Sequence, residues 1–254
     1  MTDLKEAVRQ QFEAAAERYR TSVVHAQGED LARLVMAAGL TSHERVLDAG
    51  CGAGHASMAV APFAAEVTAL DLSEAMLHQV EALADERGLG NVKALRGDIE
   101  AVPAGDGAYD CAVSRYSAHH WPNPAAAIRE LHRVLKPGGV FVLSDIVSPE
   151  APALDTFLQA IELLRDPSHV RDHTVVQWLA LLNDAGFEAE AVFEWRLPLD
   201  FEPWIERIGT PEQNATIIRA LFAGAPAEVH AEFEWEERGA FVISGALFRG
   251  VRKS

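Results

Sequence analysis

The sequence predicts an α/β protein with a doubly wound sheet. From about residue 45 to residue 145, apolar runs typical of buried strands alternate with helical stretches, which is the pattern of successive β-α units. The first predicted strand runs directly into the glycine turn of residues 50–54, and the second ends in Asp71. A strand, a glycine turn, a helix and then an acid are how such sheets hold the adenosine part of a cofactor.

The elements follow in order along the chain. Leu4, Val8, Phe12, Ala15 and Tyr19 form one apolar stripe at helical spacing, and a second helix is expected at about residues 28–38. Five parallel strands are predicted at residues 45–49, 66–71, 91–96, 109–114 and 139–145. Helices are predicted between them at residues 55–63, 73–87 and 123–135, and two further strands at residues 187–196 and 240–251.

Capping residues support these boundaries. Ser73 is a predicted N-cap, Gly88 ends the same helix, and Asn123 precedes a proline at the first helical position of the next. Thr174 and Gln177 form a predicted capping box, which opens a helix that ends near residue 186.

The glycine turn and its two flanking acids indicate the kind of cofactor. Gly50, Gly52 and Gly54 let the chain turn sharply and let a ligand approach bare backbone. Asp48 lies just before the turn, where a carboxylate suits a cationic ligand better than a pyrophosphate. Asp71 follows Gly50 at about the 20-residue spacing at which an acid accepts hydrogen bonds from ribose hydroxyls. The helix after the turn presents free amides to a carboxylate, so S-adenosylmethionine is favoured over NAD.

Composition limits the partners and the compartment. Lys and Arg total 22 against 38 Asp and Glu, a net charge of −16, and no basic stripe is present, so a nucleic-acid acceptor is not expected. The two cysteines, Cys51 and Cys111, fall in predicted buried positions, which suggests a reducing compartment. No signal peptide and no apolar run long enough to span a membrane is recognised. A cytoplasmic location is expected.

Three motifs carry a resemblance to a known family. They are Asp48-Ala49-Gly50-Cys51-Gly52-Ala53-Gly54, Leu70-Asp71-Leu72-Ser73-Glu74-Ala75-Met76 and Arg133-Val134-Leu135-Lys136-Pro137-Gly138-Gly139. In this order they resemble the class I methyltransferases, most closely the group that contains the ubiquinone and menaquinone biosynthesis methyltransferases, over about residues 40–148. Residues 165–171 instead resemble a bacterial subgroup of the family.

The resemblance implies a fold and a cofactor. The fold is a seven-stranded Rossmann-like sheet, mostly parallel, with an antiparallel last strand. The cofactor is S-adenosyl-L-methionine, with S-adenosyl-L-homocysteine as product. In the family, an acid after the third strand accepts from the adenine amino group and the following apolar residue packs on the ring, roles open to Asp98 and Ile99 after Gly97. An ordinary turn aspartate is the alternative for Asp98.

Further residues are expected around the cofactor. Leu72 and Met76 could contact the other face of the adenosine, although a helical methionine also fills cores. Ser114 and Arg115 end the fourth strand beside the sulfonium or the amino acid part. Related enzymes fold the N-terminal segment over the cofactor, which makes Tyr19 and His25 candidates for the lining; a helix anchor and a surface histidine are equally compatible with these two. Cys51 lies within the turn, where its small size explains it better than a nucleophilic role.

His119 and His120 are the candidate catalytic residues. Adjacent side chains point in different directions, so at most one is expected to face the acceptor as a general base. Asp145, His169 and His173 are further candidates for the base. No acid or cysteine completes a ligand set with the histidine pair, so no metal site is predicted.

The chain is expected to form a single domain over residues 1–254, with its core sheet in residues 40–148, 174–196 and 238–254. Residues 1–35, 149–173 and 197–236 are predicted to cap the cofactor crevice, because insertions at the carboxyl ends of parallel strands commonly make the pocket. These helices could instead pack on the sheet or on a second subunit, giving a homodimer.

The predicted function is S-adenosylmethionine-dependent methyl transfer to a small organic acceptor by direct in-line displacement. A non-catalytic S-adenosylmethionine-binding module retains the same cofactor residues and is one alternative. A NAD-dependent oxidoreductase is the other, but it would normally show a G-x-G-x-x-G turn without a charged residue at position 48.

Overall fold

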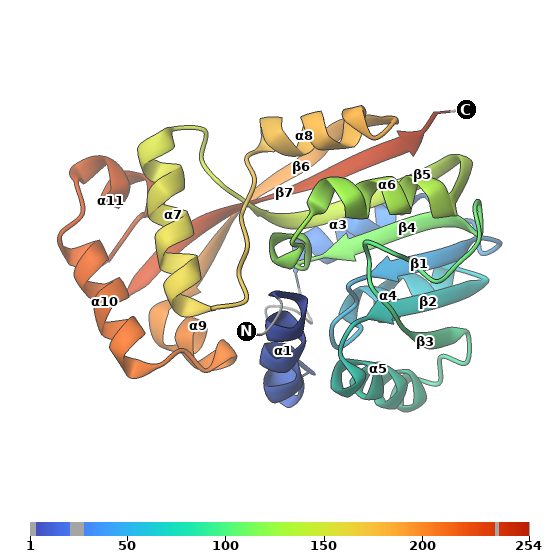
Figure 1. The fold of residues 1–254 in the computed structure, drawn as a ribbon, viewed down its shortest axis with the longest axis horizontal. Helices are drawn as coiled ribbons and strands as arrows, with labels where there is room; N and C mark the ends of the chain where they lie inside the picture. The colour runs from blue at the N-terminus through green and yellow to red at the C-terminus, as the bar shows by residue number, and fades with distance from the viewer. Residues whose placement is uncertain (1–3, 21–27, 237–238, 254) are drawn as a thin grey trace.

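The structure is a computed structural model that describes residues 4–20, 28–236 and 239–253 (Figure 1). Its strands are β1 (Arg45–Ala49), β2 (Glu66–Asp71), β3 (Val92–Arg96), β4 (Tyr109–Arg115), β5 (Leu135–Val147), β6 (Phe187–Asp200) and β7 (Ala240–Arg252). Its helices are α1 (Leu4–Arg20), α3 (Glu29–Ala38), α4 (His55–Val60), α5 (Glu74–Arg87), α6 (Pro124–Val134), α7 (Pro152–Arg165), α8 (Val175–Asp184), α9 (Phe201–Ile208), α10 (Glu212–Ala223) and α11 (Ala227–Phe233). Short 3-10 helices are η1 (Ala61–Phe63) and η2 (Ala118–His120).

The described strands form one seven-stranded sheet in the order β3-β2-β1-β4-β5-β7-β6. Strands β1 to β5 pair in parallel, and β7 runs antiparallel to both of its neighbours, β5 and β6. This confirms the predicted doubly wound, Rossmann-like sheet with an antiparallel last strand. The order reverses between β1 and β4, so a crevice is expected there, outside the carboxyl ends of the strands.

Three boundaries differ from the prediction by three residues or more. β5 begins at Leu135 rather than at residue 139, because Tyr109 of β4 pairs with Leu135 before a register shift brings Cys111 opposite Val140. The helix expected at residues 55–63 divides into α4 and η1, where a proline that has no N–H to donate lies at the start of η1. β6 continues to Asp200 as it follows β7.

The predicted caps are confirmed. Ser73 Oγ accepts a hydrogen bond from the backbone N–H of Met76 at 3.3 Å, and Gly88 ends α5 with a left-handed backbone at φ 65°. Asn123 Oδ1 accepts from the N–H of Ala126 at 3.0 Å. Both hydrogen bonds of the capping box formed by residues 174 and 177 are present.

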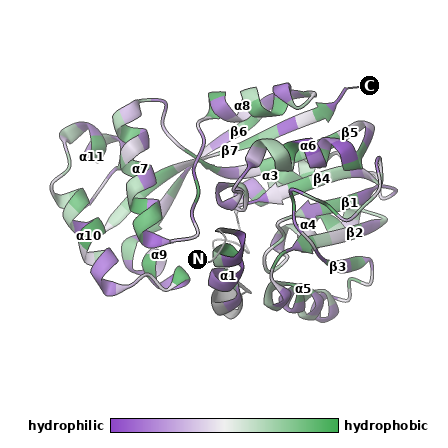
Figure 2. Cartoon of the chain, viewed as in Figure 1, coloured by the Kyte–Doolittle hydropathy of each residue, from purple (hydrophilic) through white to green (hydrophobic). Residues whose placement is uncertain are grey.

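A second cluster of apolar side chains lies beyond the main sheet. β6 and β7 extend well past the short central strands, and α7, α9, α10 and α11 surround this extension (Figure 1). Trp204, Phe222, Phe233 and Phe241 are buried among them. Helices α7 and α10 carry both apolar and polar colours in Figure 2, as expected for helices with one buried face. These four helices and the ends of β6 and β7 are called the helical lobe.

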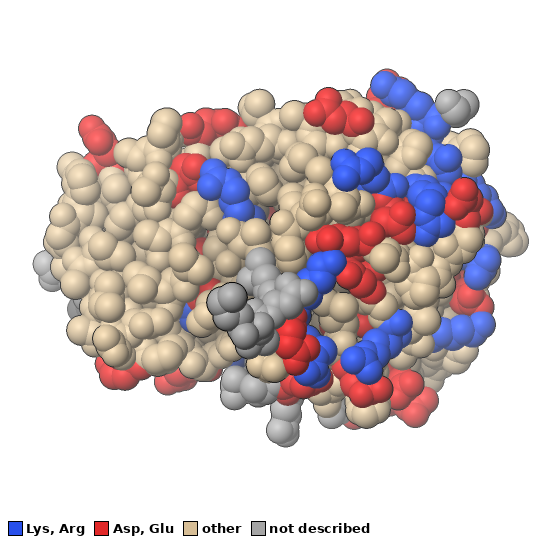
Figure 3. All heavy atoms as spheres, viewed as in Figure 1, with Lys and Arg blue, Asp and Glu red and all other residues tan. Residues whose placement is uncertain are grey.

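Helix α1 lies between the sheet and the helical lobe (Figure 1). Lys5 forms ion pairs with Asp98 and Glu100 on the sheet side, at 2.6 and 2.8 Å. Gln11 Nε2 donates to the carbonyl oxygen of Ile208 in α9 at 2.9 Å. On the face drawn in Figure 3, basic and acidic side chains are interspersed over the sheet, and the helical lobe shows few charges. Within the described ranges, no helix has the length and apolar character that a membrane span requires.

Candidate functional site

The glycine turn opens on a large pocket, called here the glycine-turn pocket, with a volume of about 1050 Å³. It lies at the carboxyl ends of β1, β2 and β4, where the strand order reverses. Most of the residues predicted to bind a cofactor line it, namely Asp48, Gly50, Cys51, Gly52, Asp71, Leu72, Met76, Gly97, Asp98, Ile99 and Arg115. His120 lines it as well.

The turn itself depends on glycine. Gly50, Gly52 and Gly54 have φ of 69°, 50° and 89°, a region that favours glycine. A Cβ on Gly50 would clash with Ser117 Oγ at 2.0 Å, so the turn packs closely against the segment after β4. A Cβ on Gly52 would meet no atom within 4 Å, so at this residue the backbone faces open space in the pocket.

Gly54 supports the turn from outside the pocket lining. It caps α4, and a Cβ there would lie 2.9 Å from Val80 Cγ2. Gly54→Ala is therefore expected to lower the free energy of unfolding by roughly 1–3 kcal/mol and the Tm by several degrees. Gly90→Ala is the matched control, because its Cβ would meet nothing within 4 Å. Equal Tm values for the two variants would contradict this role for Gly54.

Two carboxylates flank the turn, and Asp71 is only partly buried. Asp71 accepts hydrogen bonds from the backbone N–H groups of Gly52 and Ser73, at 2.9 and 2.8 Å. Asp48 is fully buried; its Oδ2 accepts from Ser57 Oγ at 2.6 Å, and its Oδ1 has no hydrogen-bond partner among the described residues. Burial raises the pKa of Asp48 to about 6 and raises the pKa of Asp71 as well. A buried carboxylate oxygen without a hydrogen-bond partner is an exception that needs an explanation.

Asp98 also lines the pocket and is held by α1. Its Oδ2 accepts from Lys5 Nζ at 2.6 Å, and its Oδ1 accepts from the N–H of Glu100 at 2.9 Å. Ile99 and Met76 are buried beside it, and Met76 packs with Phe12 of α1 and Ala53. The pocket is therefore closed on this side by α1.

Ser114 and Arg115 occupy structural positions at the end of β4. Ser114 is buried outside the pocket lining and donates to the carbonyl oxygen of Ala49 at 2.7 Å. Arg115 lines the pocket, but its guanidinium also pairs with buried Asp30 of α3 at 2.5 and 3.1 Å. The side chain of Tyr19 and all of His25 lie outside the described residues.

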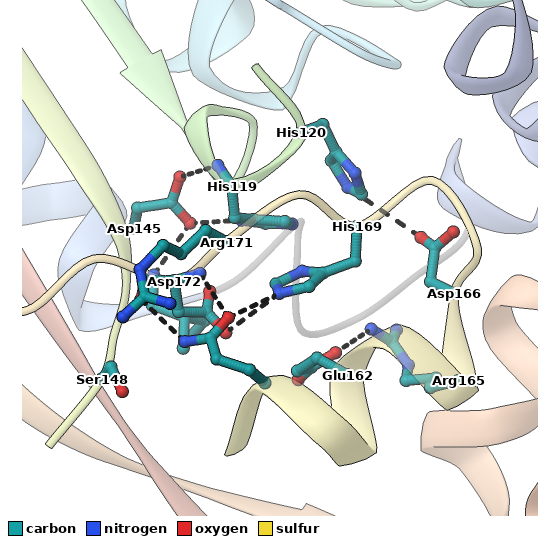
Figure 4. A network of polar contacts seen from close by, with 12 residues as sticks. His119, His120, Asp145, Ser148, Glu162, Arg165, Asp166, His169, Arg171 and Asp172 are labelled. Atoms are coloured by element: carbon teal, nitrogen blue, oxygen red, sulfur yellow. Dashed lines mark hydrogen bonds and ion pairs between the residues drawn. The ribbon is translucent and has the colours of Figure 1, made fainter. Parts of the chain in front are cut away.

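The rings of the two adjacent histidines lie close together, with centroids 4.2 Å apart and planes tilted by 53°. His120 Nδ1 lies 3.1 Å from the carbonyl oxygen of Ser168, and its ring contacts Phe12 edge-on. His119 Nδ1 lies 2.6 Å from Asp145 Oδ1 (Figure 4). Asp145 is itself fixed by the N–H groups of Ala118 and Ile146, at 2.7 and 2.8 Å.

The charges of the three neighbouring histidines differ. Burial lowers the pKa of His119, but the charge and hydrogen bond of Asp145 outweigh it and raise the pKa to about 9. Burial and the charge of His119 lower the pKa of His120 to about 4 and that of His169 to about 2. At neutral pH His119 is therefore the protonated member. His173 pairs with Gln177 at 3.3 Å and lines neither of the cavities described here.

His119 lines a second cavity, called here the lobe cavity, of about 520 Å³ between the sheet and the helical lobe. Tyr116 lines both cavities, so they adjoin at the end of β4. Leu197, Leu199 and Trp204 supply part of its apolar wall. Its other side is polar, and includes Asp172. The lobe cavity therefore combines apolar side chains with several charged ones.

The sequence reasoning missed several residues of these two cavities. Lys5 and Phe12 line the glycine-turn pocket from α1. The apolar stripe of the N-terminal helix was the available signal for Phe12, but the stripe does not say what it faces. Asp172 of the lobe cavity could not be found in this way, because the other residues that line this cavity come from distant parts of the chain.

In the described parts of the chain, no group of three or more His, Cys, Asp or Glu side chains is arranged to hold a metal ion. Cys51 and Cys111 are both buried and free. Burial raises the pKa of each thiol, so neither is activated as a nucleophile.

Comparisons with known proteins agree with this geometry. The sequence profile of a family described as a methyltransferase domain matches residues 47–143. An uncharacterised methyltransferase of Bacillus subtilis, YcgJ, is 38% identical over 247 residues, covering 95% of this chain and 98% of that protein. The crystal structure of a putative methyltransferase from Bacillus halodurans superposes with a TM-score of 0.86 at 34% identity, over 89% of this chain and 100% of the other. A Haemonchus contortus N-methyltransferase, solved with phosphomonomethylethanolamine and S-adenosylhomocysteine, shares the fold at 16% identity, with a TM-score of 0.68 over 100% of this chain and 61% of that one.

Proposed function

Because the chain belongs to the class I S-adenosylmethionine-dependent methyltransferases, we propose that it methylates a small organic acceptor bound in the lobe cavity, with the cofactor in the glycine-turn pocket. The observation that carries the proposal is the buried carboxylate of Asp48. It lines the pocket, and its Oδ1 lacks a hydrogen-bond partner among the described residues, so it could bind the ammonium group of the cofactor. Family membership argues against the NAD-dependent oxidoreductase alternative.

The residues of the glycine-turn pocket fit the parts of S-adenosylmethionine. Asp48 suits the ammonium group, and Asp71 suits the two ribose hydroxyls as an acceptor already oriented by backbone amides. Gly52 leaves room for close approach of the ligand to the backbone. Ile99 can pack on the adenine ring. The Asp98 carboxylate can accept a hydrogen bond from the adenine amino group as well as from Lys5. When bound, the cofactor supplies a methyl group made electrophilic by its sulfonium.

The chain then has to position the acceptor and exclude water. Because the lobe cavity adjoins the glycine-turn pocket at Tyr116, an acceptor there would lie next to the cofactor. Helix α1 and the helical lobe would serve as the cap predicted for the single domain. Holding two reactants in line and away from water supplies much of the rate of such a displacement, so no covalent intermediate on the enzyme is needed.

Transfer of isotopically labelled methyl groups tests this function. S-adenosylmethionine labelled in the methyl group is incubated with the protein and a fractionated bacterial metabolite extract. We expect a labelled small molecule with the wild type and none with Asp71→Ala. Binding of the cofactor without any labelled product would contradict methyl transfer to a small organic acceptor.

A further inference from the structure

On the polar side of the lobe cavity, Asp172 differs from the neighbouring acids in its hydrogen bonding. Asp172 is only 2% exposed, lines the cavity, and has no hydrogen-bond partner for its Oδ2 among the described residues. His169 Nε2 lies 3.8 Å from this carboxylate oxygen, but its ring is neutral at neutral pH and the same nitrogen lies 3.1 Å from Gln159 Oε1. One oxygen of the Asp172 carboxyl is therefore buried without a hydrogen bond.

The surrounding acids show what compensation looks like in the same network (Figure 4). Glu162 pairs with Arg165 at 3.0 Å. Asp166 Oδ1 accepts from both the backbone N–H and the Oγ of Ser168, at 2.8 and 2.6 Å. Asp145 pairs with His119. Buried carboxylates are normally satisfied in this way, and an exception needs an explanation.

The backbone of Asp172 is fixed even though its carboxyl is not. Its N–H donates to Gln159 Oε1 at 3.1 Å, and its carbonyl oxygen accepts from Gln159 Nε2 at 2.8 Å. A fixed backbone with a side chain that lacks a hydrogen bond is the arrangement expected for a group that binds a ligand. Burial and the nearby charge of Glu162 raise the pKa of Asp172 well above its usual value, which makes the carboxylate a better proton acceptor.

His119 complements Asp172 on the wall of the same cavity. Its Nδ1 is used by Asp145, which leaves Nε2 as the nitrogen available to a ligand. Since the pKa of His119 is raised to about 9, this ring donates a proton in a hydrogen bond at neutral pH and does not act as a base. The cavity thus offers one proton acceptor and one cationic donor.

Resting on the proposed function, we propose that the acceptor carries a weakly acidic hydroxyl, phenolic or enolic, whose proton passes to Asp172 while His119 stabilises the oxygen. Glu162 and Arg165 neutralise each other, so the remaining charges of the cavity decide which acceptor fits. A carboxylate needs no base and would face Asp172. An amine would arrive as an ammonium ion beside the protonated His119 and the guanidinium group of Arg207. A neutral hydroxyl is the group that makes use of both a base and a cationic donor.

The step balances without a further reactant. The hydroxyl proton moves to the carboxylate of Asp172. The hydroxyl oxygen forms the new bond to the methyl carbon with one of its electron pairs. The carbon–sulfur bond breaks and its electron pair stays on sulfur. The products are a methyl ether, a neutral thioether and a protonated Asp172, which returns its proton to solvent.

Asp172→Asn separates this role from a structural one. It removes the base and keeps the volume of the side chain. We expect the rate of labelled methyl transfer to fall by roughly 10²–10⁴-fold, with the Kd for S-adenosylhomocysteine unchanged. The Tm should stay the same or rise, since one oxygen of the replaced carboxyl lacks a hydrogen bond. The matched control is Asp184→Asn, an exposed residue at the end of α8, which should change none of the three quantities.

The label itself tests the class of acceptor. A methyl ether keeps its label in mild alkali, whereas a methyl ester releases labelled methanol. Alkali-labile label, label on nitrogen, or a loss of activity in Asp172→Asn that parallels a fall in Tm would overturn the inference while leaving the proposed function intact. If the wild type binds the cofactor and transfers no label, the proposed function fails and the inference fails with it.

Discussion

Replacing Asp71 with alanine is expected to weaken the binding of S-adenosylmethionine by about 10²-fold or more. The carboxylate is partly buried, lines the glycine-turn pocket and is oriented by the N–H groups of Gly52 and Ser73. Hydrogen bonds to a charged acceptor contribute about 1.5–3 kcal/mol each, and two ribose hydroxyls would be lost at once. Isothermal titration calorimetry of the wild type and the variant measures the difference directly.

The variant also removes the acceptor for two backbone amides, so its stability has to be measured in parallel. We expect the Tm of the Asp71→Ala apoprotein to fall by a few degrees, with the protein remaining folded at 25 °C. Asp184→Ala, which changes an exposed acid, should bind the cofactor as the wild type does. An affinity within threefold of the wild type in Asp71→Ala would show that Asp71 does not contact the ribose.

Cofactor affinity should depend on pH through Asp48. Only the ionised carboxylate attracts the ammonium group, and burial places the pKa of Asp48 at about 6 in the ligand-free protein. Affinity should therefore be nearly constant above pH 7 and fall by about tenfold for each pH unit well below 6. Titrations from pH 5 to pH 8 measure this. Asp48→Asn should bind about 10²-fold more weakly at pH 7.5 and show no such dependence.

Asp48 should make the stability of the apoprotein fall as the pH rises, whereas it makes the cofactor affinity rise. A pKa that is raised from 3.8 to about 6 on folding favours the protonated folded state, so its contribution is present below pH 3.8 and is lost as the pH rises through 6. The loss amounts to about 3 kcal/mol at pH 7. Asp48→Asn should therefore raise the Tm of the apoprotein at pH 7 while abolishing tight binding. A lower Tm would mean that the buried carboxylate is structural.

The main sheet and its caps could be predicted because their signals are local. The apolar strand before Gly50, the capping box at Thr174 and the stop at Gly88 each depend on a few neighbouring residues. Asp48 and Asp71 could be proposed as ligand contacts for the same reason, since a strand that ends at a glycine turn brings its last side chains to one edge of the sheet.

The acceptor side could not be predicted because it is assembled from distant segments. Residues of α7, β6, α9 and β7 line the lobe cavity together with Tyr116 and His119, which follow β4. Asp172 shares the lobe cavity with His119 only because the segment after α7 returns to the sheet. The pattern of apolar residues around Trp204 is compatible with both a buried core and the wall of a pocket. In the structure Trp204 is buried in the helical lobe and also lines the lobe cavity.

Direct titration of the wild type with S-adenosylmethionine, and separately with NAD, tests the central claim that the glycine-turn pocket holds a cationic adenosine cofactor. The account predicts one molecule of S-adenosylmethionine bound per chain at pH 7.5, with no detectable binding of NAD. Binding of NAD in preference to S-adenosylmethionine, or binding of S-adenosylmethionine that survives in both Asp48→Asn and Asp71→Ala, would contradict it.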